Sequence, residues 1–589
     1  MLVIRGPGAV ATVASWPAAS SPPALTSRDA RVESTLAAMS VYQKVGQTLQ
    51  AEANALSPGD LAEWPIGSIL FGGDGGPGKD DRAPVHAWVA LTQQFQQASD
   101  LPLLIGIDAV HGHNNVVGAV IYPHNIGLGA ARDPELVRRI AEATAEEVAA
   151  TGIHWDFAPT VAVPQDARWG RTYEGWSSDP ALVASYAGAA IRGYQGELGP
   201  GPLAAGRVAA TAKYFVGGGG THNGVDQGDA RLEERELIDV HAGGYVSAID
   251  AGALTVMASF SSWNGQKMHG NRSLLTDVLK GRMGFQGLVV GDWNGHEQLP
   301  GCSAGDCPDA LNAGVDLLMA PHAWKDLYKS TLRHVESGDI PLARLDDAVR
   351  RILRVKAKLG LLDGERPVVD VSRVGAPEHR QLAREAVQRS VVLLKNDGIL
   401  PISWLSHVLV AGPAADDIGT ACGGRTITWQ GNGTTNADFP NGQSIWSGIE
   451  EVVVGAEGDA ELSPDGSYTV KPDVAIVVFG EPPYAEGRGD LGDLDFTDDE
   501  GLRILRELQA DGVKTVAVFL SGRPRGIDDE LAASNAFVAA FLPGSEGGGL
   551  ADVLIGDSDG APVVDFSGKL PYAWPGEPGF PLGHGLTYR

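Results

Sequence analysis

The chain has 589 residues, and its 45 Lys and Arg stand against 73 Asp and Glu, which gives a formal net charge of −28. This excess of acid argues against nucleic acid or an anionic membrane surface as a partner, because both attract a basic surface. No run approaches the roughly 18 consecutive apolar residues that a membrane helix needs, so no membrane partner is expected. The length exceeds what one hydrophobic core accommodates, which predicts about two to four domains.

The amino-terminal residues 1–29 are rich in Ala, Pro and Ser. They lack the basic start and the continuous apolar stretch of a secretion signal, so we expect a disordered leader or the remnant of an export signal. Cys302 and Cys307 lie five positions apart in a Gly/Asp-rich loop and are able to close a small disulfide, although the sequence does not show that it forms. A disulfide would indicate an oxidising compartment, and we expect a secreted or periplasmic protein.

From residue 30 to residue 362, short apolar runs alternate with helical patterns. The runs expected to be strands cover residues 67–71, 103–107, 154–158, 208–214, 254–259, 287–290 and 315–319. Apolar residues at three- and four-residue spacing predict helices between them, most clearly over 134–151 and 342–359. About seven or eight such units favour a closed barrel over an open sheet, so residues 30–362 predict a TIM-like (β/α)8 barrel.

A linker punctuated by Gly and Pro is expected over residues 363–385, and a second α/β domain over residues 386–589. The strands expected in this second domain cover residues 390–394, 408–411, 474–479, 515–520 and 536–541. Strands alternating with helices predict an α/β/α sandwich around a parallel sheet. Residues 412–445 are rich in Gly, Thr and Asn, and a loop of this length usually has a function.

Polar or ionisable residues follow the expected barrel strands at Asp108, Lys213, Ser259 and Asp292. The carboxyl ends of barrel strands carry active sites, because the strands are rigid and the loops above them are open. Taken alone, Asp292 has an ordinary alternative role as the cap of the next helix or the start of a turn. The recurrence of such residues at strand ends favours a shared site.

Two motifs suggest other chemistry and are rejected. Residues 73–80 satisfy the glycine pattern of a nucleotide-binding loop, but Asp80 occupies the place of the Ser or Thr that would hold Mg²⁺, and Pro84 delays the helix that should bind the phosphate. His111 and His113 are spaced for a metal, but no third ligand is evident, and the neighbouring Asn residues favour a hydrogen-bonded network. Neither a metal nor a cofactor is expected.

Two further segments carry ionisable clusters with open alternatives. Residues 168–174 contain two Arg, aromatic residues and an acid, which form either a surface ion-pair cluster or a fork that binds sugar hydroxyls. Residues 480–490 follow an expected strand with a Gly-rich loop and three acids, either a solvated acidic loop or the position of a mobile catalytic carboxylate.

The motifs together resemble glycoside hydrolase family 3, in particular its exo-acting β-glucan glucohydrolase branch. The matching segments lie in the family's order at residues 106–115, 168–175, 212–217, 261–269, 287–293, 428–431, 480–486 and 583–588. The similarity covers roughly residues 30–589. The resemblance implies a retaining exo-acting hydrolase that releases glucose from the non-reducing end of β-glucans or β-gluco-oligosaccharides. A β-linked glucose oligosaccharide or polysaccharide would be its binding partner.

The resemblance also implies different catalytic roles for two carboxyl groups. Asp292, on the barrel domain, would be the nucleophile, and Glu486, on the second domain, the general acid/base. Glu486 is preferred because Glu486-Gly487 aligns with the family's catalytic Glu-Gly step, and Glu481 is the fallback. Cations beside Asp292 would keep it ionised, and acids and desolvation around Glu486 would favour its protonated form.

The family resemblance also implies which residues bind the sugars. Asp108, Arg171 and Lys213 would bind the sugar in the subsite before the scissile bond. Trp293 and Trp429 would clamp the next sugar, because the apolar faces of sugars stack on aromatic rings.

The sequence departs from the family at three of its positions. Tyr214 follows the site lysine where most members have His, Gly218 stands where they commonly have Asp, and Phe260 takes a position held by Tyr in some members. These departures keep two alternatives open: a β-N-acetylglucosaminidase of the same family, and a weakly active or inactive carbohydrate-binding relative. The first uses a Lys-His-Phe-Pro-Gly-His-Gly signature, which this chain lacks.

Overall fold

The computed structural model describes residues 9–25, 29–72, 74–364, 366, 368–577 and 579–588. The chain divides into two compact units. The barrel unit comprises Met1–Val110, Val137–Gln165 and Val183–Val374. The sandwich unit comprises His111–Leu136, Asp166–Leu182 and Gly375–Arg589, so two segments that follow barrel strands group with the second unit.

The barrel unit is built on an eight-stranded sheet in the order β10-β7-β5-β4-β3-β2-β1-β11, in which neighbouring strands run parallel. A parallel bridge between Val290 and Leu317 joins the two ends, which confirms the TIM-like barrel. The strands are β1 Leu49–Glu52, β2 Ser68–Phe71, β3 Leu104–Ile107, β4 Trp155–Asp156, β5 Ala209–Phe215, β7 Thr255–Ala258, β10 Leu288–Val290 and β11 Leu318–Met319. A small separate sheet contains β6 Asp229–Ala230, β8 Ser262–Trp263 and β9 Gln266–Lys267.

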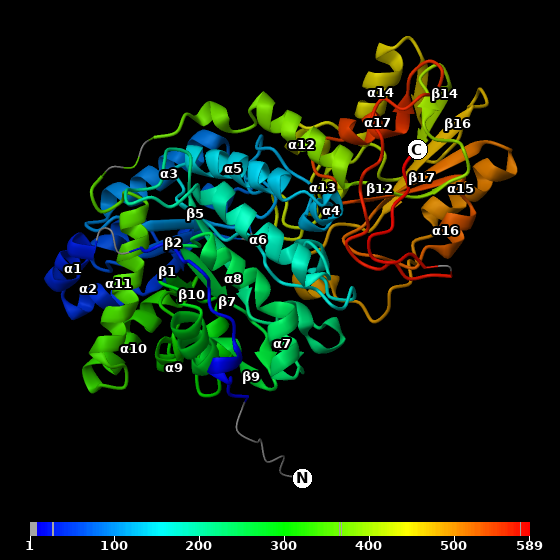
Figure 1. Cartoon of the computed structure of the whole chain (residues 1–589). Coiled ribbons are helices and arrows are strands. Elements are labelled where there is room, and N and C mark those ends of the chain that lie inside the picture. The colour runs from blue at the N-terminus through cyan, green and yellow to red at the C-terminus, as the bar shows by residue number, and fades with distance from the viewer. Residues whose placement is uncertain are drawn as a thin grey trace. The chain divides into compact units, whose positions relative to one another are not determined.

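Helices surround these strands (Figure 1). They are α1 Asp29–Ala38, α2 Val41–Gln47, α3 Val85–Ala98, α5 Pro134–Ala150, α6 Pro180–Gln195, α7 Glu234–His241, α8 Gly243–Asp250, the π-helix Ser273–Arg282, α9 Pro308–Ala313, α10 Trp324–Ser337 and α11 Leu342–Lys358. Helix α11 shows why they form, because Leu345, Val349 and Ile352 recur at three- and four-residue spacing and are buried on one face. The sequence expectation for α11 is confirmed within a residue.

The barrel interior is filled by side chains. The Trp155 indole donates from Nε1 to Oγ1 of Thr211 and Thr255 at 2.7 and 3.0 Å, and large apolar residues pack around it. Strand β1, which the sequence analysis missed, reads Leu-Gln-Ala-Glu, and its buried Gln50 donates to the Ser68 hydroxyl at 2.8 Å. A filled interior leaves only the strand ends for chemistry.

The sandwich unit has a six-stranded sheet in the order β12-β18-β17-β16-β14-β15. The strands are β12 Val392–Asn396, β14 His407–Ala411, β15 Asp459–Leu462, β16 Val474–Gly480, β17 Lys514–Leu520 and β18 Ala536–Phe541, and β13 Ile402–Ser403 pairs separately with β19 Ile555–Gly556. The expectation of an all-parallel sheet is wrong at one edge, because β12 runs antiparallel to β18. Strand β15 was not expected, since its charged residues lack the apolar pattern.

Helices cover both faces of this sheet (Figure 1). Val408, Val410 and Ile476 pack with α14 Ile445–Gly455 and α17 Gly548–Leu554, and the alternate residues Leu409 and Val477 pack with α15 Glu500–Ala510. This alternation is the period of two that a strand buried on both faces presents. The remaining helices of the unit are α4 Asn125–Ala131, α12 Pro377–Ser390, α13 Ile418–Cys422 and α16 Asp528–Ala532.

Two boundary expectations need correction. Residues 9–25 are not disordered, because Trp16 is buried, donates to Glu234 at 2.9 Å and accepts from Arg282 through its carbonyl at 2.8 Å. Residues 1–8 and 26–28 of the expected leader lie outside the described residues. Helix α12 begins at Pro377, inside the segment expected as a linker.

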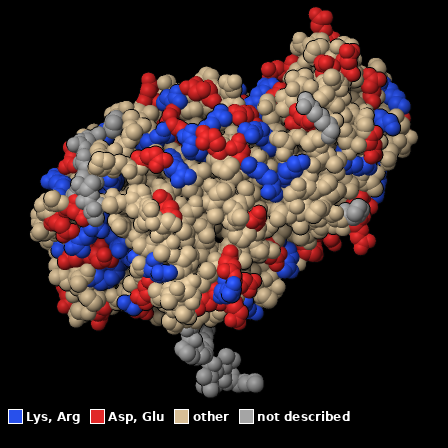
Figure 2. All heavy atoms as spheres, viewed as in Figure 1, with Lys and Arg blue, Asp and Glu red and all other residues tan. Residues whose placement is uncertain are grey.

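Acidic and basic side chains are interspersed over the face in Figure 2. In the part of the chain that the structure describes, no helix is long and apolar enough to cross a membrane.

Candidate functional site

An ion pair joins two strand ends of the barrel unit. Lys213, in β5, donates from Nζ to Oδ1 of Asp108, which follows β3, at 2.8 Å. The lysine side chain is 1% exposed and that of the aspartate 24%, so the pair presents its carboxylate towards solvent. Asp156, at the end of β4, is buried, and its Oδ1 accepts the Ala109 N–H at 2.9 Å. Burial raises the pKa of Asp156 well above its usual range.

Asp292 follows β10 directly and is held by its backbone. Its N–H donates to Nε2 of His269 at 2.9 Å, and its Oδ1 accepts the N–H of Trp293 at 2.7 Å. Burial lowers the pKa of His269 to about 3, so the ring is neutral and Nε2 is free to accept. Gly295 is required here, because a Cβ at this position would lie 2.3 Å from the ring.

Aromatic side chains line the same end of the barrel. Tyr214 is buried in the interior cluster, and Lys213 Nζ lies 5.3 Å from its ring centroid. Trp293 packs against this cluster and meets the His322 ring edge-on at 5.9 Å. Phe260 lies 6.0 Å from the His269 ring. Tyr214 thus lies beside the buried lysine, and Phe260 lies beside the neutral imidazole that fixes the backbone of Asp292.

A second cluster lies in the sandwich unit. Arg171 binds Glu174 through two hydrogen bonds, from Nε at 2.8 Å and from Nη2 at 3.0 Å. Arg425 donates to Glu174 at 3.2 Å and also contacts Glu486 Oε1. Arg171 Nη2 lies 3.7 Å from the same Glu486 oxygen. The two arginines therefore connect a buried glutamate to the Glu486 carboxylate, so Arg171 and Glu174 are not part of a surface cluster.

The second oxygen of Glu486 is also engaged. Trp429 donates from Nε1 to Oε2 at 2.5 Å, and the residue is 42% exposed. Gln430 accepts the Ala485 N–H at 2.9 Å and so ties the loop of Trp429 to that of Glu486. The acidic neighbours expected around Glu486 are not its contacts, because the carboxylate faces guanidinium and indole groups instead.

Glu481 has a different environment. It is buried, ion-paired with Arg525, 3.4 Å from Arg523 Nε, and bonded by the Tyr484 hydroxyl at 2.9 Å and the Gly522 N–H at 3.2 Å. A carboxylate with this many fixed partners is suited to holding a loop in place.

The sequence analysis rejected a metal site at His111 and His113 and a nucleotide-binding loop at residues 73–80. His111 stacks on His124 with centroids 3.6 Å apart, and burial lowers the pKa of His111 to about 4 and of His113 to about 3. Among the described residues no group of three or more His, Cys, Asp and Glu is placed to hold a metal ion. In the nucleotide-like loop, Gly73 lies outside the described residues, and α3 begins only at Val85.

Cys302 and Cys307 form a disulfide.

Sequence reasoning missed three residues of these clusters. Arg425 has no sequence signal beyond its place four residues before Trp429. Asp156 ends strand β4, but it lies inside a run expected to be a buried strand, so it was not predicted as a site residue. His269 ends one of the recognised motifs, and its buried position next to Asp292 is visible only in the fold.

Comparisons with known proteins agree with these features. The model of the glycosyl hydrolase family 3 N-terminal domain matches residues 40–355, and that of the C-terminal domain matches residues 391–588. The crystal structure of an exo-1,3/1,4-beta-glucanase from a Pseudoalteromonas species is 46% identical with a TM-score of 0.94, over 98% of this chain and 75% of that one.

Two curated relatives are similar over most of the chain. A lysosomal beta glucosidase from Dictyostelium discoideum is 32% identical over 94% of this chain and 73% of that protein. A periplasmic beta-glucosidase from Salmonella typhimurium is 27% identical over 93% of this chain and 74% of that protein.

Proposed function

Because this chain belongs to glycosyl hydrolase family 3, we propose that it is a retaining exo-acting hydrolase that releases glucose from the non-reducing end of β-glucans or β-gluco-oligosaccharides. The family resemblance drawn from the sequence is confirmed by the matches to both family domains. The glucanase and glucosidase names of the similar proteins support β-linked glucose as the substrate class.

The observation that carries the proposal is the setting of Asp292. It stands at the carboxyl end of a barrel strand, with its backbone fixed by His269. In the proposed reaction its carboxylate attacks the anomeric carbon, the glycosidic bond breaks, and a covalent glycosyl-enzyme forms. Water then attacks the same carbon and returns the β-configuration. Retention by this route needs two carboxyl groups about 5 Å apart.

Glu486 is the proposed second carboxyl group, which protonates the leaving oxygen and then deprotonates the water. Its Oε1 contacts Arg425 and its Oε2 accepts from Trp429. Because both carboxylate oxygens of Glu486 have a hydrogen-bonding partner, at least one partner must leave before Glu486 can donate a proton to the leaving oxygen. A sugar stacked on Trp429 would compete for the indole and so couple substrate binding to that release.

The proposed sugar contacts use the remaining residues. Asp108 and Lys213 would bind sugar hydroxyls, and Arg171 would do the same. Trp293 and Trp429 would hold the next sugar by stacking. Tyr214 and Phe260 would line the pocket.

A secreted or periplasmic location is part of the proposal. The Cys302–Cys307 disulfide is of a kind that persists in oxidising compartments, and one similar protein is named periplasmic.

The test is a panel of β-linked gluco-disaccharides, with the product anomer followed by NMR in the first minutes. We expect β-glucose to appear first, and Asp292→Asn to abolish turnover with the fold intact by circular dichroism. α-Glucose as the first product would contradict retention. A nitrophenyl N-acetylglucosaminide cleaved faster than the nitrophenyl glucoside would contradict the substrate class.

A further inference from the structure

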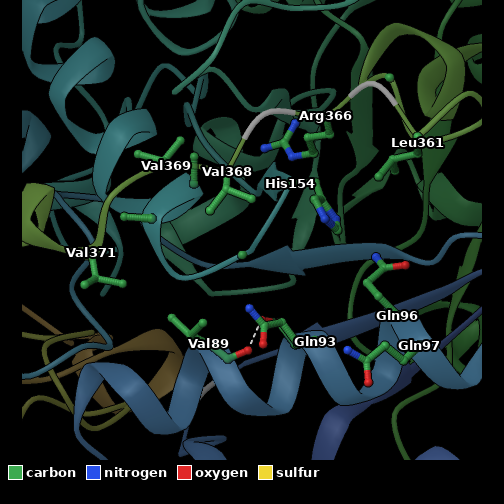
Figure 3. A pocket seen from close by; sticks show the side chains of 16 residues that line it. Val89, Gln93, Gln96, Gln97, His154, Leu361, Arg366, Val368, Val369 and Val371 are labelled. Atoms are coloured by element: carbon green, nitrogen blue, oxygen red, sulfur yellow. Dashed lines mark hydrogen bonds between the residues drawn. The ribbon is translucent and has the colours of Figure 1, made fainter.

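A cavity of about 410 Å³ lies within the barrel unit, away from the residues described above (Figure 3). Helix α3, the end of α5 and described residues after α11 form its walls, the last group being Gly360, Leu361, Gly364, Arg366, Val368, Val369 and Val371. His154 lines it and directly precedes β4, which places the cavity at the amino ends of the strands. Asp108 and Asp292 follow strands at their carboxyl ends, so the cavity lies at the opposite end of the barrel.

Arg366 is a charged wall residue of this cavity. Its Nη2 donates to the carbonyl oxygens of Ile153 at 3.4 Å and Arg207 at 3.3 Å. Within the described residues, no carboxylate lies at ion-pair distance from this guanidinium, and Nε and Nη1 have no acceptor. Burial lowers the pKa of Arg366 to about 10, so it remains charged at neutral pH. A partly desolvated cation without a counter-charge is unfavourable, and an anion beside it would offset that cost.

His154 supplies a second donor. Its Nδ1 accepts the Ile105 N–H at 3.4 Å, so Nε2 carries the hydrogen of the neutral ring. Burial lowers the pKa of His154 well below its usual range, and the charges of Arg366 and Lys356 act in the same direction. Figure 3 shows Arg366 and His154 next to each other on the wall, in agreement with the effect of the Arg366 charge on the imidazole. Together they offer N–H donors with one net positive charge.

The rest of the wall is mostly apolar. Val368 and Val371 are 95% and 49% exposed, and valine, alanine and leucine side chains continue the surface. Gln96, on α3, is already bonded at both ends of its amide to the Leu103 backbone, at 2.8 and 3.0 Å. Among the described lining residues there is no carboxylate and no Phe, Tyr or Trp, so the wall lacks the ring on which a sugar would stack.

We propose that this cavity binds a small organic acid with a hydrocarbon body, its carboxylate on Arg366 and His154 and its chain against the valines. One guanidinium and one neutral imidazole match a single negative charge, whereas a phosphate dianion would need further cations. The volume falls in the range of about 300–1,000 Å³ that small-molecule pockets occupy. The inference does not rest on the proposed hydrolytic function.

The experiment measures binding to the full chain by isothermal titration calorimetry, with hexanoate as the probe and hexanamide as its neutral counterpart. We expect hexanoate to bind about tenfold more tightly than hexanamide, because a charge-assisted hydrogen bond contributes more than a neutral one. Arg366→Gln should remove that preference. Arg235→Gln, at a side chain that is 90% exposed on α7, should keep it.

A second variant guards against a misfolded Arg366→Gln protein. Val371 lies on the rim and is half exposed, so Val371→Glu adds a negative charge without opening the core. It should weaken hexanoate by about threefold to tenfold and leave hexanamide unchanged. Equal affinity for the two probes, no binding of either at about 10 mM, or hexanoate binding that survives both variants would overturn the proposal.

Discussion

Glu481 and Glu486 lie on one loop, and exchanging each for Gln should have opposite consequences. Glu481 is 5% exposed, paired with Arg525 and close to Arg523. Glu481→Gln would leave two buried guanidinium groups without their carboxylate. Gln keeps an oxygen that accepts from Tyr484 or Gly522, so the packing is preserved while the charge is lost.

The magnitude follows from these contacts. Removing one partner of a buried ion pair costs about 3–5 kcal/mol, and the retained hydrogen bonds favour the lower end. A cost near 3 kcal/mol lowers Tm by roughly 6–12 °C for a domain of about 150–250 residues. Glu486 has a side chain that is 16% exposed, and its partners Arg171 and Arg425 keep Glu174, so Glu486→Gln should cost about 1 kcal/mol or less.

The assay pairs thermal unfolding with hydrolysis of a laminari-oligosaccharide and of an activated aryl glucoside. Glu486→Gln should lose about 10²- to 10⁴-fold on the oligosaccharide, less on the aryl substrate, and regain rate with added azide. Glu481→Gln should lose stability, with no rescue by azide. If Glu481→Gln melts normally and shows azide rescue while Glu486→Gln keeps its rate, the assignment of the two carboxyl groups is wrong.

Two further predictions concern the barrel unit. Lys213→Met removes the buried cation that Asp108 contacts at 2.8 Å, so kcat/KM should fall about 30-fold or more, with Lys213→Arg less affected, as steady-state kinetics would show. His334→Gln tests a pH-dependent contact, because bonding to Asp339 and Asp306 raises the pKa of His334 above 6.5. A raised pKa means that protonation stabilises the fold below about pH 6.5 and that this is lost as pH rises through the raised value. The variant should therefore have a lower Tm than the parent at about pH 6 and the same Tm at about pH 9; equal curves at both pH values would contradict this.

The sequence predicted the barrel because most of its buried strands are apolar runs and long helices such as α5 and α11 carry an apolar face. It failed where those rules do not hold. Strand β1 has the polar Gln50 in the interior, where its amide N–H donates to a hydroxyl from the next strand, and no local pattern reveals that partner. The antiparallel direction of β12 could not be predicted either, because an apolar run has the same pattern in a parallel and in an antiparallel strand.

The candidate site was predictable to the extent that its residues stand in recognisable segments. Asp108 and Asp292 follow strands and Lys213 lies near the end of one, and these positions alone suggest a shared edge. Arg425 comes from a glycine-rich loop, and its contact with Glu486 depends on how two loops of the sandwich unit fold together. Long-range contacts of this kind are set by tertiary packing, which a reading of local patterns cannot supply.

The departures at Tyr214 and Gly218 are adjacent in space. A Cβ at Gly218 would lie 3.6 Å from the Tyr214 Cβ and 3.0 Å from Ser259 Oγ, which a small rotation of the hydroxyl relieves. Tyr214→His alone would give an imidazole without the acid that relatives commonly have, so a gain should need Gly218→Asp as well. We expect the double variant to exceed the product of the single effects on kcat/KM by about fivefold or more, a coupling of about 1 kcal/mol. Effects that simply multiply would mean that the two positions changed independently.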